Sequence, residues 1–323
     1  MSGIVDKTSQ KPTIKVIGIG ECGCNTVEMI FAKGIKGIEF IAIDTDVQTL
    51  LRIQGPIKIQ IEEGFIEFLE AEEKQAVKER SLLKEESKLR KAIEGYNLVF
   101  IITGMGGETG TRVAPLIAKV AKDMGILTVG IVTYPFNFEG KKRHERAKIG
   151  IRKLKEFVDT LIVVPNQKLL DVASNDMSVL DAFRLLIDDV FYQAIKRIVE
   201  PITKVGLISI DFSDVRTVIR NGGYAFIGSG KATGKDKGIV AARKAINSPF
   251  LKDVQLEKAS YVLISIKGGM DLTLDEVYEA VRLVEERTKR DNTNFFFAVN
   301  IEEEIEDSVE ITVIATGISK AVW

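Results

Sequence analysis

Residues 103–115 combine glycines, hydroxyls and one carboxylate in a pattern that is typical of anion binding. They read TGMGGETGTRVAP, follow the apolar run 98–103 and lead into an amphipathic stretch that continues to about residue 124. A glycine turn between a strand and a helix leaves backbone N–H groups unpaired at the positive end of the helix dipole, which suits a phosphate. Glu108 lies in the middle of this turn and Arg112 in the first helical turn. A carboxylate therefore stands where a phosphate would bind.

A second glycine turn follows the first predicted strand. Residues 18–23 read GIGECG, which matches GxGxxG, and Asp44 ends the next strand, where a dinucleotide fold places its ribose acid. Taken alone, this pattern indicates either a NAD-binding enzyme or a tight turn from strand to helix. Glu21 would lie beside the pyrophosphate, and no residue can be nominated for proton transfer. The NAD-dependent enzyme is therefore the weaker alternative.

A third candidate, residues 228–235, reads GSGKATGK and looks like a Walker loop. Its spacing is wrong, and Asp236 follows the lysine where that loop needs Ser or Thr. We predict a flexible loop there. The first two turns can converge on one nucleotide, because the carboxyl ends of parallel strands meet at the same edge of a sheet.

The elements that must hold these turns alternate between strands and helices. In the first half we predict strands at 13–20, 39–44, 58–61, 98–103, 127–132 and 160–164, and helices from about 25, within 64–94, up to 124 and at 140–157. This rhythm predicts a doubly wound parallel sheet. A long helix from Ser178 to about 199 follows. Beyond it we predict strands at 206–211, 261–266, 294–300 and 309–318, and helices at 213–220 and 236–246.

The predicted fold class is therefore α/β with two domains, which a length of 323 residues allows. A doubly wound parallel-sheet domain of the nucleotide-binding type covers 13–177. A connecting central helix, 178–204, joins it to a smaller mixed-sheet domain, 205–323, and residues 1–12 are predicted to be a flexible tail.

Composition argues against several classes of protein. The 45 basic side chains nearly balance 46 acidic ones, so nucleic-acid binding driven by net charge is not expected. The polar start holds no signal peptide and no apolar run reaches membrane-spanning length, which predicts a cytoplasmic protein without direct membrane insertion. Cys22 and Cys24 are too few ligands for zinc, and we predict small packing residues instead of a metal site.

Several further motifs follow one another along the chain. They are the turn 103–115, TYPFNFEGKKR at 133–143, VPNQKLL at 164–170, LDAF at 180–183, IDFSDVRTV at 210–218 and GSG at 228–230. With these motifs the chain resembles the FtsZ family of the tubulin superfamily over residues 13–318. The resemblance implies a cytoskeletal protein of cell division that binds GTP between subunits and stacks head to tail into protofilaments. GTP is then hydrolysed when the next subunit's catalytic loop reaches it.

The resemblance also implies a set of site residues. They are Asn25, Asn166 and Asp189 for guanine, Phe183 for stacking on the base, Glu139 and Arg143 for the ribose, and Gly20, Gly23, Gly104, Gly106, Gly107, Thr109, Gly110 and Thr111 in the two phosphate turns. Carbonyl and carboxylate oxygens suit the amino and imino donors of guanine. GTP or GDP is the implied cofactor, and Mg²⁺ is expected only where GTP binds.

The phosphate end departs from the family pattern. Glu21, Glu108 and Arg112 replace glycines, Asp44 replaces an Asn, and residues 70–75, predicted to be helical, stand where the family has a Gly/Ala loop. Two like charges about 4 Å apart repel by roughly 4 kcal/mol at an effective dielectric near 20, enough to weaken triphosphate binding about a thousandfold. We hypothesise that the Glu108 carboxylate fills the anion site itself, with Arg112 as its counter-ion. The rival is that Arg112 contacts a phosphate and Glu108 swings outward.

The predicted catalytic loop reads SIDFSD at 209–214. The family has Asn-x-Asp-x-x-Asp there, and its two acids orient the attacking water in the neighbouring subunit's site. The resemblance assigns this role to Asp211 and Asp214. The alternative, equally open, is that Asp211 or Ser213 caps helix 213–220 while Asp214 favours its first turn.

Two functions follow from the resemblance. The main one is an FtsZ-like filament protein in which GTP binding and hydrolysis are weakened or lost. Its partners are further copies of itself, with another FtsZ-like filament as a further candidate. The alternative is an active GTP-dependent division GTPase with an atypical phosphate site.

Overall fold

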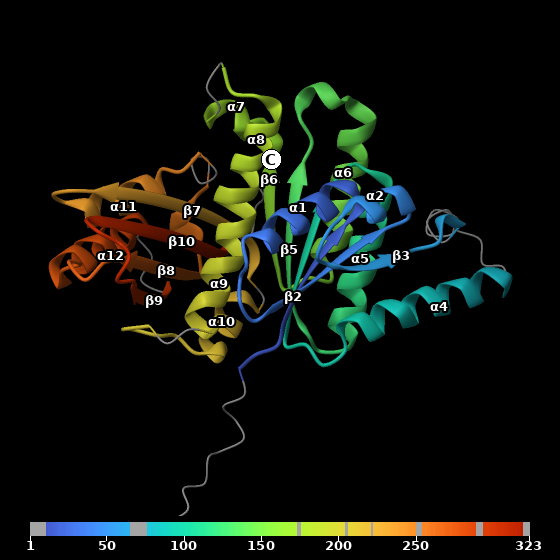
Figure 1. Ribbon diagram of the computed structural model, residues 1–323, viewed down its shortest axis with the longest axis horizontal. Helices are drawn as coiled ribbons and strands as arrows, with labels where there is room; N and C mark the ends of the chain where they lie inside the picture. The colour runs from blue at the N-terminus through green and yellow to red at the C-terminus, as the bar shows by residue number, and fades with distance from the viewer. Residues whose placement is uncertain are drawn as a thin grey trace, which may run out of the picture.

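The computed structural model describes residues 11–64, 76–172, 176–203, 206–220, 222–249, 254–288 and 293–318. The strands of these residues form one ten-stranded sheet in the order β3-β2-β1-β4-β5-β6-β7-β10-β8-β9 (Figure 1). The first half of the sheet carries the two glycine turns, and the second half lies beyond the long central helix.

The first half is a parallel sheet covered by helices on both faces. Its strands are β1 (Ile14–Ile19), β2 (Ile38–Asp44), β3 (Ile57–Gln60), β4 (Leu98–Gly104), β5 (Leu127–Tyr134) and β6 (Thr160–Pro165); its helices are α1 (Gly20–Ala32), α2 (Val47–Arg52), α4 (Ala76–Ile93), α5 (Glu108–Asp123), α6 (Lys141–Lys155) and the short α7 (Leu169–Val172). Alternate residues of β1 pack into two separate cores, Val16 with α1 and the central helix, and Ile17 with α4, α5 and α6. Burial on both faces explains why the inner strands β1, β4, β5 and β6 are almost entirely apolar, whereas the edge strand β3 is largely exposed and carries Lys58 and Gln60.

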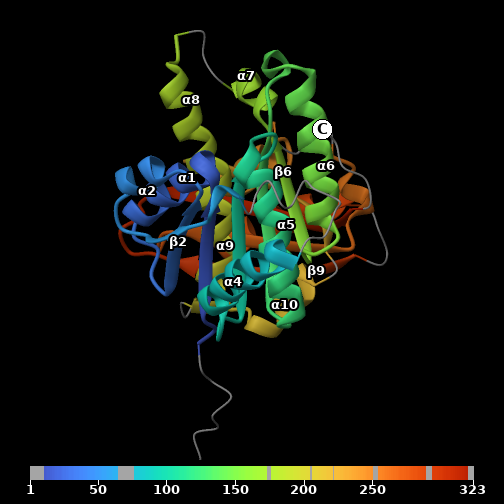
Figure 2. The same cartoon turned by 90° about the vertical axis from the view of Figure 1, so that its right-hand side faces the viewer.

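The central helix connects the two halves. It consists of α8 (Val179–Leu186), a π-helical turn over Ile187–Tyr192 and α9 (Gln193–Thr203), and it is followed by α10 (Phe212–Ile219). Its apolar face packs into the same core as α1. Figures 1 and 2 show α7 and α8 at one end of the molecule and α10 at the opposite end.

The second half is a mixed sheet. Its elements are β7 (Gly223–Thr233), α11 (Lys237–Ile246), β8 (Tyr261–Gly268), α12 (Leu274–Thr288), β9 (Asn294–Ile301) and β10 (Ser308–Ile318). β10 runs antiparallel to β7 and β8, whereas β8 and β9 are parallel. β6 and β7 pair in parallel over Thr160–Ile162, so the two halves share one continuous sheet.

The predicted fold class is confirmed, with three local corrections. The strand predicted at 206–211 is wrong, because only an isolated bridge from Ile208 to Val299 forms there. The loop predicted at 228–235 is also wrong: residues 228–233 belong to β7, and a Cβ on Gly230 would lie 2.1 Å from the Ala241 carbonyl oxygen of α11. The glycine there allows close packing of helix on strand. Helix α12 was not predicted, and the predictions for residues 1–10 and 65–75 fall outside the described residues.

Candidate nucleotide-binding site

The two glycine turns meet at the carboxyl edge of the sheet, as predicted. α1 begins directly after β1 at Gly20, whose φ of +71° lies in the left-handed region. A Cβ on Gly20 would lie 3.3 Å from the backbone nitrogen of Gly110 in the second turn. The hydroxyls of Thr45, after β2, and Thr109 are 3.1 Å apart. Loops from three neighbouring strands therefore converge on one place.

Two of the helices that start at this edge, α1 and α5, have no side-chain cap at their N-termini. α2, α8 and α10 each begin with a side chain that accepts a bond from the first turn, from Asp46, Ser178 and Asp211 respectively. α1 and α5 begin after Ile19 and Gly107, which provide no side-chain cap. Their first-turn N–H groups are left as donors for an anion. Two such helix ends side by side suit a chain of phosphates.

Several glycines of the second turn are required by the turn's own packing. Gly106 has φ +103°, and a Cβ there would lie 2.7 Å from Cγ and 2.9 Å from the carbonyl oxygen of Arg143 on α6. The N–H of Gly106 donates to the buried hydroxyl of Thr111 at 2.8 Å. A Cβ on Gly110 would lie 2.0 Å from the Thr103 hydroxyl. Gly106, Thr111 and Gly110 thus fix the shape of the turn.

Two carboxylates of the phosphate end, those of Glu108 and Glu21, are exposed, whereas Asp44 is buried and accepts the N–H of Thr45 at 2.7 Å. The side chain of Glu108 is 65% exposed, and its Oε1 lies 3.5 Å from Nη2 of Arg146 on α6. Glu21 is also exposed and lies 3.7 Å from Arg52. The exposed position of Glu108 argues against the hypothesis that its carboxylate fills the anion site, whereas the role of Arg112 as its counter-ion stays a prediction. Burial, with the nearby charge of Arg146, lowers the pKa of Arg112.

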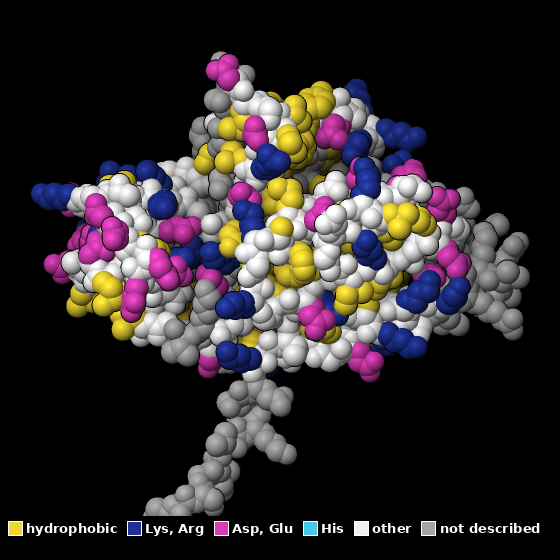
Figure 3. Space-filling view, in the orientation of Figure 1, with side chains coloured by type: hydrophobic (Ala, Val, Ile, Leu, Met, Phe, Trp, Pro, Cys, Tyr) yellow, Lys and Arg dark blue, Asp and Glu magenta, His cyan; other side chains and the backbone are white. Residues whose placement is uncertain are grey.

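A cleft of about 710 Å³ opens beside the second turn, and we call it the aromatic cleft. It is lined by Cys22, Gly104, Met105, Thr133, Pro135, Phe136, Phe138, Glu139, Arg143, Asn166, Leu169, Leu170, Met177, Val179, Ala182 and Phe183. The resemblance had indicated Gly104, Glu139, Arg143, Asn166 and Phe183 among these. Hydrophobic side chains gather at this end of the molecule, over α7 and α8 (Figure 3). Four of the predicted nucleoside residues therefore line one cavity: Glu139 just before α6, Arg143 on α6, Asn166 just after β6 and Phe183 on α8.

Asn166 is the polar group of the cleft that most needs a ligand. It follows β6 and is only 8% exposed, and its Oδ1 is buried with no hydrogen-bond partner within the described part of the chain. A buried acceptor without a donor costs free energy. The amino and imino groups of guanine are donors of the kind that this oxygen lacks.

Glu139 and Arg143 already contact one another. Nε of Arg143 lies 3.0 Å from the Glu139 carboxylate, which also accepts the N–H of Phe136 at 2.7 Å. The pair closes one side of the aromatic cleft, and its role at the ribose stays a prediction.

Aromatic rings make up much of the cleft wall. Phe183 packs edge-on against Phe136 with ring centroids 6.0 Å apart, and Phe136 stacks on the exposed Phe138 at 4.9 Å. Phe136 and Phe138 were missed as site residues, although the run YPFNF at 134–138 was a visible signal. A base entering the cleft would meet these rings.

Some predicted residues lie elsewhere. Asn25 is exposed on α1 and does not line the cleft. Asp189 falls in the π-helical turn, and its side chain lies outside the described residues. Cys24 is buried, as expected of a packing residue, whereas Cys22 is exposed and lines the cleft, so that prediction was wrong for Cys22. Gly23 is buried in the first turn, where a Cβ would lie 2.4 Å from the Ile102 carbonyl oxygen.

Asp211 and Asp214 form a capping box at the start of α10. Asp211 Oδ1 accepts the N–H of Asp214 at 2.9 Å, and Asp214 Oδ2 accepts the N–H of Asp211 at 3.1 Å. The Ser213 hydroxyl and the Asp214 N–H lower the pKa of Asp211. α10 lies at the opposite end of the molecule from the aromatic cleft (Figure 1). One subunit alone therefore does not bring these acids to the cleft.

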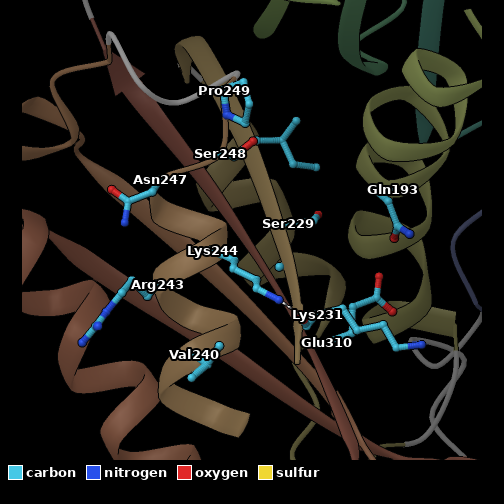
Figure 4. Close-up of a pocket in the computed structure, with 12 residues that line it drawn as sticks. Gln193, Ser229, Lys231, Val240, Arg243, Lys244, Asn247, Ser248, Pro249 and Glu310 are labelled. Carbon is cyan, nitrogen blue, oxygen red and sulfur yellow. Dashed lines mark hydrogen bonds between the residues drawn. The ribbon is translucent and has the colours of Figure 1, made fainter. Parts of the chain in front are cut away.

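A larger cleft, of about 810 Å³, lies between α9 and the second half of the sheet (Figure 4). Several of its polar groups already have partners inside the chain. The Lys244 ammonium donates to the Lys231 carbonyl oxygen at 2.9 Å, and the Ser229 hydroxyl lies 2.9 Å from that of Thr312. Glu310 is paired with Arg197. We therefore place the candidate site in the aromatic cleft.

Two absences apply to the described residues. They contain no group of three or more His, Cys, Asp or Glu side chains that could hold a metal ion. None of their helices combines the length and apolar character needed to cross a bilayer.

Comparisons with known proteins agree with this architecture. A sequence model of the Tubulin/FtsZ family, GTPase domain, matches residues 13–174, and one of the FtsZ family, C-terminal domain, matches residues 223–319. The cell division protein FtsZ of Pseudomonas putida is 42% identical over 318 residues, covering 98% of this chain and 79% of the relative. FtsZ of Buchnera aphidicola, from the pea-aphid strain, is 42% identical over 310 residues, covering 96% and 80%.

Solved structures give the same result. The chain is similar to an empty FtsZ dimer from M. jannaschii, with a TM-score of 0.82 and 38% identity over 95% of this chain and 89% of that one. A CetZ from Methanosaeta thermophila, at 20% identity and a TM-score of 0.76, covers 96% of this chain and 87% of its own, and shares the fold.

Fold and cleft together define a protein of the tubulin superfamily. Within that superfamily the chain belongs to the FtsZ family. This membership sets aside the alternative of a NAD-dependent enzyme.

Proposed function

We propose that this protein is a filament-forming cell-division protein that binds GTP in the aromatic cleft and the two glycine turns. The observation that carries the proposal is the buried Oδ1 of Asn166, an acceptor without a partner in a cavity walled by aromatic rings. Relatives that cover nearly all of this chain are named cell division proteins. The proposed division of labour gives Asn166 and Phe183 the base, Glu139 and Arg143 the ribose, and the turn N–H groups the phosphates.

Head-to-tail stacking would complete the site. The cleft end carries exposed apolar side chains, among them Phe138, Leu170 and Val179, and the α10 end carries exposed Leu207 next to the capping box. A partner that covers both apolar ends would bury surface that is otherwise costly to expose. In such a stack Asp211 and Asp214 of one copy would face the cleft of the next and orient a water there. Mg²⁺ bound with the phosphates would neutralise part of their charge.

We further propose that phosphate binding is weakened, though only moderately. Glu108 and Glu21 are exposed and each lies beside an arginine, so their repulsion of a phosphate is screened. The loss expected for such charges is about tenfold in affinity, well below the thousandfold expected of a carboxylate inside the site.

Nucleotide content tests the binding proposal. Purified protein is denatured, and the released small molecules are separated by chromatography. GTP or GDP in the wild type, and its loss in Asn166→Ala, would support binding in the aromatic cleft. A wild type that neither carries nor takes up guanine nucleotide at millimolar concentration would refute it.

Hydrolysis needs a variant that separates catalysis from capping. Asp211→Asn keeps a good N-cap but removes the carboxylate, since Asn caps helices about as well as Asp. GTP turnover per subunit should rise with protein concentration in the wild type and fall in Asp211→Asn while filaments still form. Turnover that is independent of concentration would contradict a site shared between subunits.

A second function, a filament that does not hydrolyse GTP, is favoured by one observation. Each of the two acids of the loop already uses one carboxylate oxygen to cap α10, Oδ1 of Asp211 and Oδ2 of Asp214. Filaments that form without nucleotide, together with equal turnover in wild type and Asp211→Asn, would favour this second function.

A further inference from the structure

A basic groove of about 560 Å³ runs between α5 and α6 on the outer face of the first half. Its walls carry Arg112, Lys119, Lys142, Arg146 and Lys153, with Glu145 as the acid among the lining residues. Its floor is apolar, formed by Pro115, Leu116, Ile149 and Phe157. Within the described part of the chain, Lys119, Lys142 and Lys153 make no ion pair. The groove therefore suits an acidic surface that also carries apolar side chains.

The opposite half of the molecule exposes such a surface on α12. Leu274 is 81% and Tyr278 62% exposed, four residues apart on one face of the helix. Asp275 and Glu279 each follow one position later, which places acids along one edge of this apolar face. Asp275 makes no ion pair among the described residues, whereas the exposed Glu279 is paired with Arg282 at 2.7 Å and would have to share its carboxylate with a lysine. We call Leu274, Asp275, Tyr278 and Glu279 the acidic stripe.

The groove and the stripe lie on opposite flanks of the molecule. In Figure 2, α5 faces the viewer with α6 beside it, whereas the second half of the sheet lies behind; Figure 1 places α12 at the far end of the long axis. Figure 3 shows acidic side chains gathered over the α12 end, next to a hydrophobic group. Arg112 and Arg146 adjoin the second glycine turn, whereas Lys119 and Lys153 lie farther along α5 and α6, away from the cleft end. Head-to-tail stacking would leave both open along the sides of a filament.

We propose that the acidic stripe of one copy docks in the basic groove of a second copy and joins filaments side by side. The stripe's Leu274 and Tyr278 cover the apolar floor, while its acids face Lys119 and Lys153. The contact uses two different surfaces and does not close on itself, so it builds sheets or bundles of filaments. The existence of filaments to be joined rests on the proposed head-to-tail assembly. The contact between groove and stripe itself does not need nucleotide.

Charge exchange tests this contact. Lys119→Glu with Lys153→Glu reverses the charge of two groove residues, and Asp275→Lys with Glu279→Lys reverses the charge of the stripe. A chain with all four changes restores opposite charges on the two surfaces. The matched control reverses two exposed lysines outside the groove, Lys36→Glu with Lys58→Glu. Electron microscopy with GTP at low salt scores filaments and bundles separately, and GTP turnover is measured in parallel.

Each two-residue reversal in the groove or stripe should raise the protein concentration needed for bundling by about tenfold or more, because unlike charges become like. Single filaments and turnover should stay as in the wild type, the control should bundle normally, and the four-residue chain should bundle again. The proposal would be overturned if the groove and stripe variants bundled at the same protein concentration as the wild type. It would also be overturned if the wild type never bundled at low salt.

A wild type that forms no filaments would refute the proposed assembly but would still leave the lateral contact testable. Sedimentation of the nucleotide-free protein at low salt then reports self-association directly. Association lost in each reversal and regained in the four-residue chain supports the contact. Association that is absent, or equal in all variants, overturns it.

Discussion

Arg197 of α9 and Glu310 of β10 form an ion pair that ties the central helix to the second half of the sheet. The Arg197 side chain is fully buried, and its Nε also donates to the Gln193 amide oxygen at 3.2 Å. Because a buried guanidinium needs a compensating charge, the pair fixes how α9 lies against β10. Of the two residues, Glu310 also lines the larger cleft beside α9.

Removing one partner of this pair should be costly. Glu310→Gln leaves the buried Arg197 with only the more distant carboxylate of Glu200, 4.0 Å away, and should lower the free energy of unfolding by about 2 to 4 kcal/mol. Urea denaturation measures the change. The control is Glu286→Gln, whose exposed pair with Arg282 should contribute less than about 1 kcal/mol. Equal losses in the two variants would contradict the importance of the buried pair.

The same pair should make stability depend on pH. Burial alone would raise the pKa of Glu310, but the charge and hydrogen bond of Arg197 outweigh it and lower the pKa below the ordinary 4.5. A carboxyl whose pKa is lowered by folding stabilises the protein above 4.5, and this contribution is lost as pH falls through the folded-state pKa. The free energy of unfolding, measured above and below the pKa of Glu310, should fall less on acidification in Glu310→Gln than in the wild type. An identical loss would show that other carboxyls govern the acid range.

The buried oxygen of Asn166 predicts base specificity. Asn166→Ala should weaken guanine nucleotide binding by about 10- to 100-fold, the cost of one lost bond to a buried polar group. Calorimetric titration with GTP and ATP should also show a smaller preference for GTP. Asn247→Ala, in the larger cleft, is the control and should bind like the wild type. Unchanged affinity in Asn166→Ala would exclude this residue from the base site.

The outward position of Glu108 predicts a modest charge effect at the phosphates. Glu108→Gln should improve GTP affinity by less than about tenfold at low salt, and by less still at high salt, because the carboxylate is exposed and paired with Arg146. Titrations at two salt concentrations measure this. Glu63→Gln, an exposed acid on another segment, serves as the control. A gain of several hundredfold would mean that the carboxylate occupies the phosphate position.

Gly106 should tolerate no side chain. Gly106→Ala combines a left-handed backbone with a Cβ 2.7 Å from Arg143, and it should cost about 2 to 4 kcal/mol of stability. Gly125 also has a positive φ of 70°, but a Cβ there meets nothing within 4 Å. Gly125→Ala should therefore cost only about 1 kcal/mol, the price of the backbone alone. Thermal or urea unfolding distinguishes the two contributions, and similar costs would show that α6 moves aside easily.

The first half of the fold could be predicted from sequence because its strands are buried on both faces. β1 and β4 are continuous runs of apolar residues ending in glycine turns, which is a strong local signal. β7 gave the opposite signal: Gly228 and Gly230 interrupt its pattern, since α11 packs directly on its backbone. α12 was missed because Leu274 and Tyr278 face outward and disturb the helical period.

The candidate site was predicted unevenly for a related reason. The glycine turns follow from local sequence, so their convergence was foreseen and is confirmed. The contact of Glu108 with Arg146 depends on where α6 packs, and this distant arginine could not be foreseen from the local sequence. Asn166 carries no signal of its own, because only the cleft around it leaves its oxygen without a donor.

The pairing of β6 with β7 spans only Thr160–Ile162, yet it decides how many unprotected strand edges the protein has. One continuous sheet ends only at β3 and β9. Separate sheets in the two halves would add bare edges at β6 and β7, and such edges invite aggregation by pairing with other chains. The pairing of β6 with β7 therefore protects one strand edge of each half of the protein from pairing with another chain.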